Sequence, residues 1–285
     1  MKDEISIYIP VFNGEKTIKA CLESVFEQTL KPKQILVIND NSNDGTLEIL
    51  KSFREKIEII SNSSNKGVSF SRNLAVNHLK TRYIASIDAD VVLSKNWIEQ
   101  IINSLKKNSA TLVGGRLYEK FIENPFNLWR SIRLRQHWGD HNLLNPKFIF
   151  GCNNILDTKK ILNVKELYKN EDEYFKLNGD DTELGKFLTK HSHTMFYDSS
   201  AICYHLQDDN GLSLTKRYWR YLHYGDGLKK RNFFKTLKNL IRQTKKTLIW
   251  TSIDLFKFNF KLILVNFVIL YYFVILDIKF NIKNN

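Results

Sequence analysis

The chain has 285 residues, 43% of them hydrophobic, and a formal net charge of +13. This length and apolar content support one substantial core with an appendage. The sequence has no internal repeat and no low-complexity linker, which excludes a repeat array. Its cysteines, Cys21, Cys152 and Cys203, are isolated. Their spacing excludes a zinc-ribbon type of metal site and predicts reduced, mostly buried thiols.

The first third of the chain alternates apolar runs with amphipathic segments. We predict buried strands at 5–9, 34–38, 57–60 and 83–87, and helices at 15–29, after Thr46 and at 67–80. Strands that alternate with helices favour right-handed crossovers and a parallel sheet. Because parallel strands end at one edge of a sheet, Asp40 and Asp88 are expected on the same edge.

The strand predicted at 83–87 ends in Asp88-Ala89-Asp90. Carboxylates at the end of a buried strand are how an α/β protein presents a divalent metal to a phosphate. The pattern is weak by itself, because acidic pairs are common at strand ends. Its meaning depends on the motifs around it.

Six motifs of the chain resemble, in order, those of the family 2 glycosyltransferases. They are Ile9-Pro10-Val11-Phe12-Asn13-Gly14-Glu15, the acidic loop from Val37 to Thr46, the segment from Asn65 to Asn73, Asp88-Ala89-Asp90, Gly179-Asp180-Asp181-Thr182-Glu183-Leu184-Gly185, and Tyr204-His205. The resemblance spans residues 5–206 and implies an α/β GT-A fold, with a Rossmann-like, mostly parallel sheet flanked by helices. Asn39, where an aspartate is usual, and Val91, where an acidic residue is frequent, depart from the family pattern.

The resemblance also implies roles for single residues. Nucleotide-sugar binding is implied for Pro10, Phe12, Glu15, Asp40, Arg72, Asp88 and Ala89, and binding of Mn²⁺ or Mg²⁺ for Asp90 and His205. A sugar nucleotide leaves as a diphosphate, so a divalent cation suits the charge that develops. Structural interpretations stay open: Asp40 could cap a helix, Arg72 could be a helix-surface charge, and His205 could be a structural histidine.

The acidic pair Asp180-Asp181 opens a predicted helix. A transferase that inverts the sugar needs a base for the acceptor hydroxyl, and the resemblance selects Asp181 for this role, with Asp180 on the acceptor side. Helix capping is the alternative. Asn153 and Asn154 follow a strand predicted at 148–152 and are either acceptor-side residues or turn residues.

Positive charge is concentrated after Leu212. Residues 216–246 contain eleven Lys or Arg against Asp226 alone, interleaved with aromatic residues. Such a segment suits an anionic membrane or a nucleic acid, and the apolar run at 262–276 favours the membrane. Fifteen helical residues reach about 22 Å, less than the roughly 30 Å hydrocarbon core. A short span, an in-plane helix and a buried core helix therefore all stay open.

We predict a catalytic domain at 1–211 and a basic, aromatic, helical, membrane-associating tail at 212–285. No signal peptide is expected before the strand at 5–9, which places the catalytic domain on the cytoplasmic face of the cell membrane. The predicted activity is transfer of a sugar from a nucleotide-sugar donor to a hydroxyl acceptor, such as a lipid-linked glycan of the cell envelope. The Gln-x-x-Arg-Trp motif of processive synthases is absent from the sequence.

Two alternatives belong to other functional classes. A nucleotidyltransferase would share the sheet and carboxylates but should have a glycine-rich, lysine-bearing phosphate loop, which Asn13-Gly14-Glu15-Lys16 matches poorly. A basic nucleic-acid-binding protein on a degenerate enzyme fold would have to overcome repulsion between its polyanion and the carboxylates at positions 40, 88, 90 and 181.

Overall fold

A computed structural model describes residues 4–161, 167, 179–223 and 233–283. Backbone contacts divide the chain into two compact units. The first unit comprises Met1–Tyr118 and Gln136–Leu206, and the second comprises Glu119–Arg135 and Gln207–Asn285. The acidic run at 171–173 and the basic residues at 229–231 lie outside the described residues.

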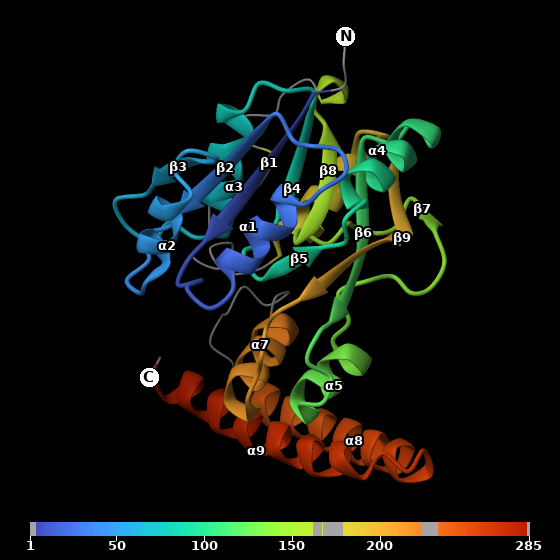
Figure 1. Ribbon diagram of the computed structural model, residues 1–285. Coiled ribbons are helices and arrows are strands. Elements are labelled where there is room, and N and C mark those ends of the chain that lie inside the picture. The colour runs from blue at the N-terminus through green and yellow to red at the C-terminus, as the bar shows by residue number, and fades with distance from the viewer. Residues whose placement is uncertain (1–3, 162–166, 168–178, 224–232, 284–285) are drawn as a thin grey trace. The chain divides into compact units, whose positions relative to one another are not determined.

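The first unit is built on a mixed β-sheet (Figure 1). Its nine described strands have the order β3-β2-β1-β4-β8-β6-β9-β5, with β7 paired to β9. The strands are β1 (Ile5–Val11), β2 (Gln34–Asn39), β3 (Glu58–Ser61), β4 (Tyr83–Ile87), β5 (Val91–Leu93), β6 (Leu112–Glu119), β7 (Leu143–Leu144), β8 (Asn153–Asp157) and β9 (Met195–His205).

The strands β1 to β4 are parallel, as predicted from the alternation of strands and helices. Ile9 lies opposite Val37 across β1 and β2, and Ile7 lies opposite Ala85 across β1 and β4. Asp40 and Asp88 each follow the last residue of a parallel strand. The two carboxylates therefore lie at the same edge of the sheet.

The prediction of a strand at 148–152 is wrong, because the strand in this region is β8, which begins at Asn153 and runs antiparallel to β4. The apolar residues before it serve another purpose. The rings of Phe148 and Phe150 pack against Trp138, with centroid distances of 5.1 and 6.0 Å. The phenylalanines of this segment therefore serve to form an aromatic cluster, and they do not form a strand.

Helices cover both faces of this sheet. The helices α1 (Ile18–Phe26), α2 (Thr46–Ser52) and α4 (Trp97–Lys107) bury apolar side chains on one face, and α3 (Val68–His78) and α6 (Asp180–Lys190) do so on the other. A short 3-10 helix, η1 (Thr158–Lys160), follows β8. All three cysteines are buried and free, which confirms the prediction from their spacing.

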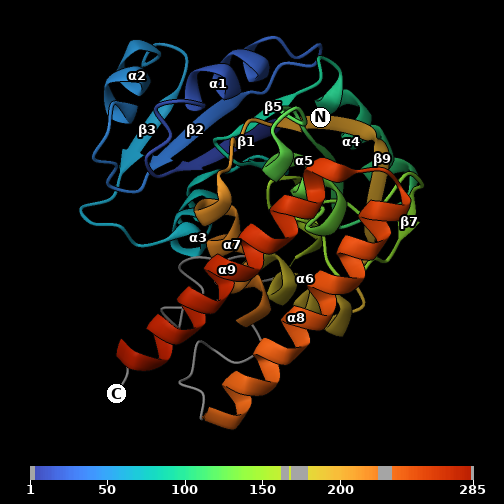
Figure 2. The ribbon, with the colours of Figure 1, turned by 90° about the horizontal axis from the view of Figure 1, so that it is seen from below.

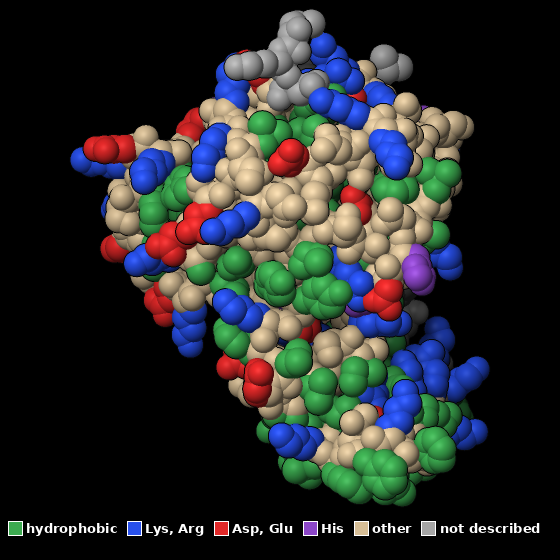
Figure 3. Space-filling view, turned by 45° about the vertical axis from the view of Figure 1, so that its right-hand side comes forward, with side chains coloured by type: hydrophobic (Ala, Val, Ile, Leu, Met, Phe, Trp, Pro, Cys, Tyr) green, Lys and Arg blue, Asp and Glu red, His purple; other side chains and the backbone are tan. Residues whose placement is uncertain are grey.

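The second unit is helical and consists of α5 (Pro125–Arg133), α7 (Gly211–His223), α8 (Phe233–Phe256) and α9 (Phe260–Lys283). Figure 2 shows α8 and α9 side by side. The unit has its own apolar core, formed by Trp129 from α5, Leu214, Tyr218 and Trp219 from α7, and Leu262, Val265, Ile269 and Phe273 from α9. Other hydrophobic side chains of this unit stay on the surface (Figure 3).

Helix α9 contains the apolar run that the sequence analysis identified at 262–276, so the prediction that this run is helical is confirmed. Within it, Phe260–Asn281 is long and apolar enough to cross a membrane by length and composition. Only 33% of its most apolar window is buried. Helix α9 is therefore not buried on all sides, as a core helix of a soluble protein would be.

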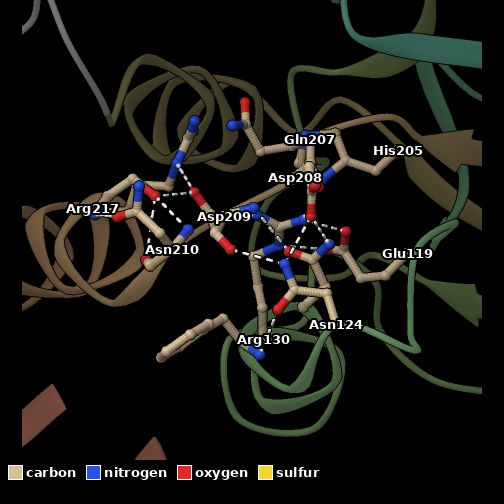
Figure 4. Close-up of polar contacts among 12 residues, drawn as sticks. Glu119, Asn124, Arg130, His205, Gln207, Asp208, Asp209, Asn210 and Arg217 are labelled. Atoms are coloured by element: carbon tan, nitrogen blue, oxygen red, sulfur yellow. Dashed lines mark hydrogen bonds and ion pairs between the residues drawn. The ribbon is translucent and has the colours of Figure 1, made fainter. Parts of the chain in front are cut away.

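An arginine of α5 holds the two chain segments of the second unit together (Figure 4). Arg130 is 2% exposed, and its Nε donates to Glu119 Oε1 at 2.8 Å. Its Nη2 donates to Gln207 O at 2.9 Å, and its Nη1 pairs with Asp209. Residues 119–135 thus belong with the C-terminal helices, an association that the predicted boundary at 211/212 does not include.

Candidate active site

A buried arginine joins three parts of the first unit. Arg72 comes from α3, and its side chain is 4% exposed. Its Nη2 donates to Asp88 Oδ1 at 2.8 Å, and its Nη1 pairs with Asp180, whose side chain is 5% exposed. The interpretation of Arg72 as a helix-surface charge is therefore excluded. Its guanidinium links α3, the end of β4 and the start of α6.

A glycine makes room for this arginine. A Cβ atom on Gly151 would lie 2.5 Å from Arg72 Nη1 and 2.8 Å from its Cζ, which is far inside van der Waals contact. The loop before β8 therefore packs its backbone directly against the guanidinium. The sequence analysis missed this role of Gly151, because only the packing of two distant segments reveals it.

The predicted base follows Asp180 in the first turn of α6. Burial raises the pKa of Asp181 to about 7, the negative charge of Asp180 contributes to the rise, and the positive charge of Arg72 opposes it. Oδ1 of Asp181 accepts a hydrogen bond from Thr182 N at 2.7 Å. A carboxylate with a pKa near neutrality can both take and release a proton, which suits a general base.

The two predicted metal ligands lie side by side. Asp90 directly precedes β5, His205 ends β9, and the two strands pair with Val91 opposite His205. As a result, His205 Nε2 lies 3.2 Å from Asp90 Oδ2. The backbone supports this geometry, since Leu206 N donates to Asp90 O at 2.7 Å.

The side chains of Asp90 and His205 are of types that can bind Mn²⁺ together with a phosphate. No group of three or more His, Cys, Asp and Glu side chains that could hold a metal occurs in the part of the chain that the structure describes. Mn²⁺ accepts carboxylate oxygens, and ions in phosphate-transfer sites commonly take only one or two protein ligands, with phosphate and water supplying the rest. Asp90 and His205 would supply those protein ligands.

Asp40 fixes the start of α3. One of its carboxylate oxygens accepts hydrogen bonds from Lys66 N at 2.8 Å and from Asn62 Nδ2 at 2.7 Å, and the other accepts from Gly67 N at 2.8 Å. The carboxylate thus holds the turn that positions the helix of Arg72. Contact between Asp40 and a nucleotide base stays a prediction. Asn62, which follows β3, was not singled out in the sequence analysis.

The loops after β1 and β2 are bonded to each other. Glu15 Oε2 accepts from Gly45 N at 2.9 Å, and Gly14 N donates to Thr46 Oγ1 at 2.8 Å. Asn13, with a positive φ of 53°, accepts from Asn43 N through its side chain at 2.9 Å. Reciprocal bonds of this kind give the first two loops at the sheet edge one fixed arrangement.

The other residues predicted to bind the nucleotide differ in exposure. Pro10 is buried within β1, Phe12 follows β1 and is 49% exposed, and Ala89 packs against the apolar core. Phe12 thus presents an aromatic ring to solvent beside the loops joined by Glu15. Nucleotide contact by any of these residues stays a prediction.

Asn153 and Asn154 make internal hydrogen bonds. Asn153, which is 0% exposed, accepts from Gly115 N at 2.9 Å and donates to Cys203 Sγ at 2.6 Å. Asn154, which is 2% exposed, donates to Phe150 O at 3.1 Å. These contacts give both side chains a structural role at the start of β8. A role on the acceptor side stays a prediction.

Comparison with known proteins identifies the class to which this fold and site belong. Residues 6–169, more than half of the chain, match the family described as Glycosyl transferase family 2. The chain belongs to this family. Membership of this family favours a glycosyltransferase over the nucleotidyltransferase and nucleic-acid-binding alternatives.

One similar curated protein is the UDP-Glc:alpha-D-GlcNAc-diphosphoundecaprenol beta-1,3-glucosyltransferase WfgD of Escherichia coli. The two are 33% identical over 121 residues, which is 42% of this chain and 47% of that protein. The chain spans less than half the length of the first curated relatives that it matches.

Solved structures share the fold. S. aureus TarS in complex with UDP-GlcNAc matches with a TM-score of 0.58 and 14% identity, over 79% of this chain and 66% of that one. The mannosyltransferase PcManGT from Pyrobaculum calidifontis, in complex with GDP-Man and Mn2+, matches with a TM-score of 0.57 and 13% identity, over 78% of this chain and 61% of that one. These similarities confirm the predicted GT-A-like α/β fold.

Replacement of the buried arginine should destabilise the protein. In Arg72→Met, the carboxylates of Asp88 and Asp180 lose their cation, and breaking a buried ion pair in this way costs about 3–5 kcal/mol of the free energy of unfolding. Urea denaturation followed by circular dichroism measures the change. The control Arg54→Met removes an exposed arginine and should alter stability by less than about 0.5 kcal/mol. Equal losses in the two variants would contradict the role assigned to Arg72.

Proposed function

We propose that this chain transfers a sugar, with inversion, from a nucleotide-sugar donor to a hydroxyl group of a lipid-linked acceptor. The proposal rests on the cluster in which Arg72 joins Asp88 to Asp180, because it sets Asp181 beside buried charges of both signs. This arrangement gives a carboxyl group that is poised for proton transfer near neutral pH. Incubation with a panel of nucleotide sugars, with and without Mn²⁺, tests the proposal through hydrolysis and transfer.

The relatives support the finer parts of this proposal. The name of WfgD specifies UDP-Glc and a diphosphoundecaprenol-linked sugar. The structural neighbours contain UDP-GlcNAc in one case and GDP-Man with Mn2+ in the other. A nucleoside diphosphate sugar, a divalent cation and a lipid-linked glycan are therefore the substrates and cofactor that we propose for this chain.

In the proposed reaction the acceptor oxygen attacks the anomeric carbon opposite the leaving diphosphate. The new glycosidic bond forms as the bond between the anomeric carbon and the diphosphate oxygen breaks, so the configuration inverts. Asp181 takes the proton of the acceptor hydroxyl. The products are the glycosylated acceptor and a nucleoside diphosphate.

The charge of the leaving group requires a counterion. A divalent cation would neutralise the developing negative charge on the diphosphate. Asp90 and His205 would hold it where β5 begins and β9 ends, because their side chains lie 3.2 Å apart there. In the same proposal, Asp40, Glu15 and the exposed ring of Phe12 shape the nucleotide site.

The acceptor class also suggests where the enzyme works. A lipid-linked acceptor lies in a membrane, and α9 contains the described segment, Phe260–Asn281, that is long and apolar enough to cross one by length and composition. We therefore propose that the enzyme acts at the cytoplasmic face of the cell membrane, with the second unit in contact with anionic lipid.

Replacement of the proposed base should stop chemistry but not donor binding. Asp181→Asn should lower kcat by roughly two to four orders of magnitude, because an amide cannot accept the proton. Calorimetry should show nearly unchanged donor affinity. Glu183→Gln, in the same helical turn, is the matched control and should keep most activity. A parallel collapse of donor affinity and kcat in Asp181→Asn would assign the residue to binding or folding instead.

The pKa of Asp181 also predicts the pH dependence. Since the base must be ionised, kcat/KM should fall about tenfold for each pH unit below the pKa of about 7 and level off above it. The value of kcat/KM falls at low pH because protonated Asp181 cannot take the proton of the acceptor hydroxyl. Stopped assays across this range measure the profile. A flat profile between about pH 5 and 8 would show that no group of this pKa limits the reaction.

The metal ligands can be tested apart from the base. Asp90→Asn should lose most turnover, because a neutral amide is a poorer ligand for a hard cation. Electron paramagnetic resonance should show weaker Mn²⁺ binding in the presence of the donor nucleotide. Glu27→Gln, an exposed substitution at the end of α1, is the control. Full activity of Asp90→Asn in metal-limited buffer would remove Asp90 from the site.

A further inference from the structure

Helix α9 has an apolar outer stripe. Leu264, Phe267, Tyr271 and Ile278 are 70%, 45%, 63% and 48% exposed. Their spacing of four or three residues, or of two turns, places them on one side of the helix. Soluble proteins seldom leave so long a row of large apolar side chains in water. We therefore expect another molecule to cover this stripe.

Two polar side chains of α9, Asn266 and Asp277, point the other way. Asn266 is 1% exposed, accepts from Trp129 Nε1 at 2.9 Å and donates to Asp254 at 2.8 Å. Asp277 is 4% exposed and accepts from Trp219 Nε1 at 3.0 Å. These contacts run to α5, α8 and α7, so hydrogen bonds fix which side of α9 faces the unit.

A second buried contact sets the same orientation near the end of the helix. His223 Nε2 lies 2.9 Å from Asp277 Oδ1, and His223 Nδ1 lies 2.6 Å from Trp219 O. Rotation of α9 about its axis would leave Asp277 and Asn266 without these partners, at a high cost for buried polar groups. The outer stripe is therefore a fixed feature of the fold.

The neighbouring helix adds positive charge. Lys235, Lys238, Arg242 and Lys245 of α8 are exposed. The acidic residues in the described part of the two helices, Asp254 and Asp277, are both buried and paired. The exposed charge of α8 and α9 is thus entirely positive in the residues that the structure describes. Figure 3 shows hydrophobic and basic side chains together over these helices.

We propose that α8 and α9 lie flat in the surface of an anionic membrane and that neither helix crosses it. The outer stripe of α9 enters the edge of the hydrocarbon region, and the basic residues of α8 contact lipid phosphates. Apolar side chains in the second half of α8 extend the apolar surface: Leu248, Ile249, Ile253, Leu255 and Phe256 are all exposed.

The pairing of the helices argues against a crossing. Because α8 packs along α9, a spanning α9 would bring Lys238, Arg242 and Lys245 into the hydrocarbon core, where cations are strongly disfavoured. A flat orientation keeps them at the head groups. Charge also argues against a second copy of the chain as the occupant, since two identical basic surfaces would repel each other.

This inference deepens the proposed membrane function, yet its test needs neither donor nor acceptor, so it can fail while the proposed chemistry stands. Leu264, Tyr271 and Ile278 are replaced by Cys one at a time and labelled with a nitroxide. The native thiols are buried, and labelled wild-type protein measures their background. Lys51→Cys, on the exposed side of α2, is the aqueous control.

Collisions with oxygen and with a nickel chelate then report the depth of each label in vesicles of phosphatidylcholine and phosphatidylglycerol. The three sites are seven residues apart, or about 10 Å along a helix axis. A flat helix gives all three labels the same shallow depth. A spanning helix gives depths that differ by about 10 Å, with the label at 271 deepest, and overturns the proposal.

Other outcomes are equally decisive. Labels that stay accessible to nickel in the presence of vesicles would show that no lipid covers the stripe. Dipolar broadening with loss of access to both quenchers would show that a second copy covers it. Either result overturns the proposal. Circular dichroism of each variant confirms that the labelled protein is folded.

The charge contribution is tested separately. Lys238→Gln with Lys245→Gln should weaken binding to the anionic vesicles about fivefold for each charge removed, and should change binding to phosphatidylcholine alone little. The matched control, Lys51→Gln with Lys106→Gln, removes two exposed lysines of the first unit. Equal effects of the two pairs would show that net charge, and not the surface of α8, governs binding.

Discussion

The ion pairs of Arg72 are the interaction on which the first unit depends. One guanidinium, 4% exposed, compensates Asp88 after β4 and Asp180 in α6, which are 92 residues apart in the sequence. In a poorly solvated site, an aspartate without this partner would be neutral or would not be buried. The arginine therefore allows carboxylates to gather where the donor phosphates are proposed to bind.

The same cluster gives two adjacent carboxyl groups, those of Asp180 and Asp181, different properties. Asp180 is paired directly with Arg72, whereas burial and the charge of Asp180 raise the pKa of Asp181 to about 7. Environment, and not residue type, thus distinguishes a binding or structural aspartate from a candidate base. Gly151 is part of this arrangement, because a side chain there would occupy the position of the guanidinium.

Helix α9 of the second unit carries two polar side chains on its inner side. Asn266 and Asp277 are buried and bonded to neighbouring helices, while Leu264 and Tyr271 face outward. This inversion of the usual pattern leaves a surface that water solvates poorly and that lipid would solvate well. Arg130 joins α5 of the same unit to the segment that follows His205 in the sequence, through its bond to Gln207 O.

The sequence by itself determined the parallel strands, the edge that carries Asp40 and Asp88, and the helix starting at Asp180, because strand and helix periodicity and motif order are local properties. Only the tertiary structure decided that the Arg72 guanidinium pairs with Asp180 rather than being solvated by water. It also decided that Asn153 begins β8 rather than following a strand, and that residues 119–135 join the C-terminal helices. Ion pairs, sheet register and burial arise between distant segments, and no local pattern specifies the partner.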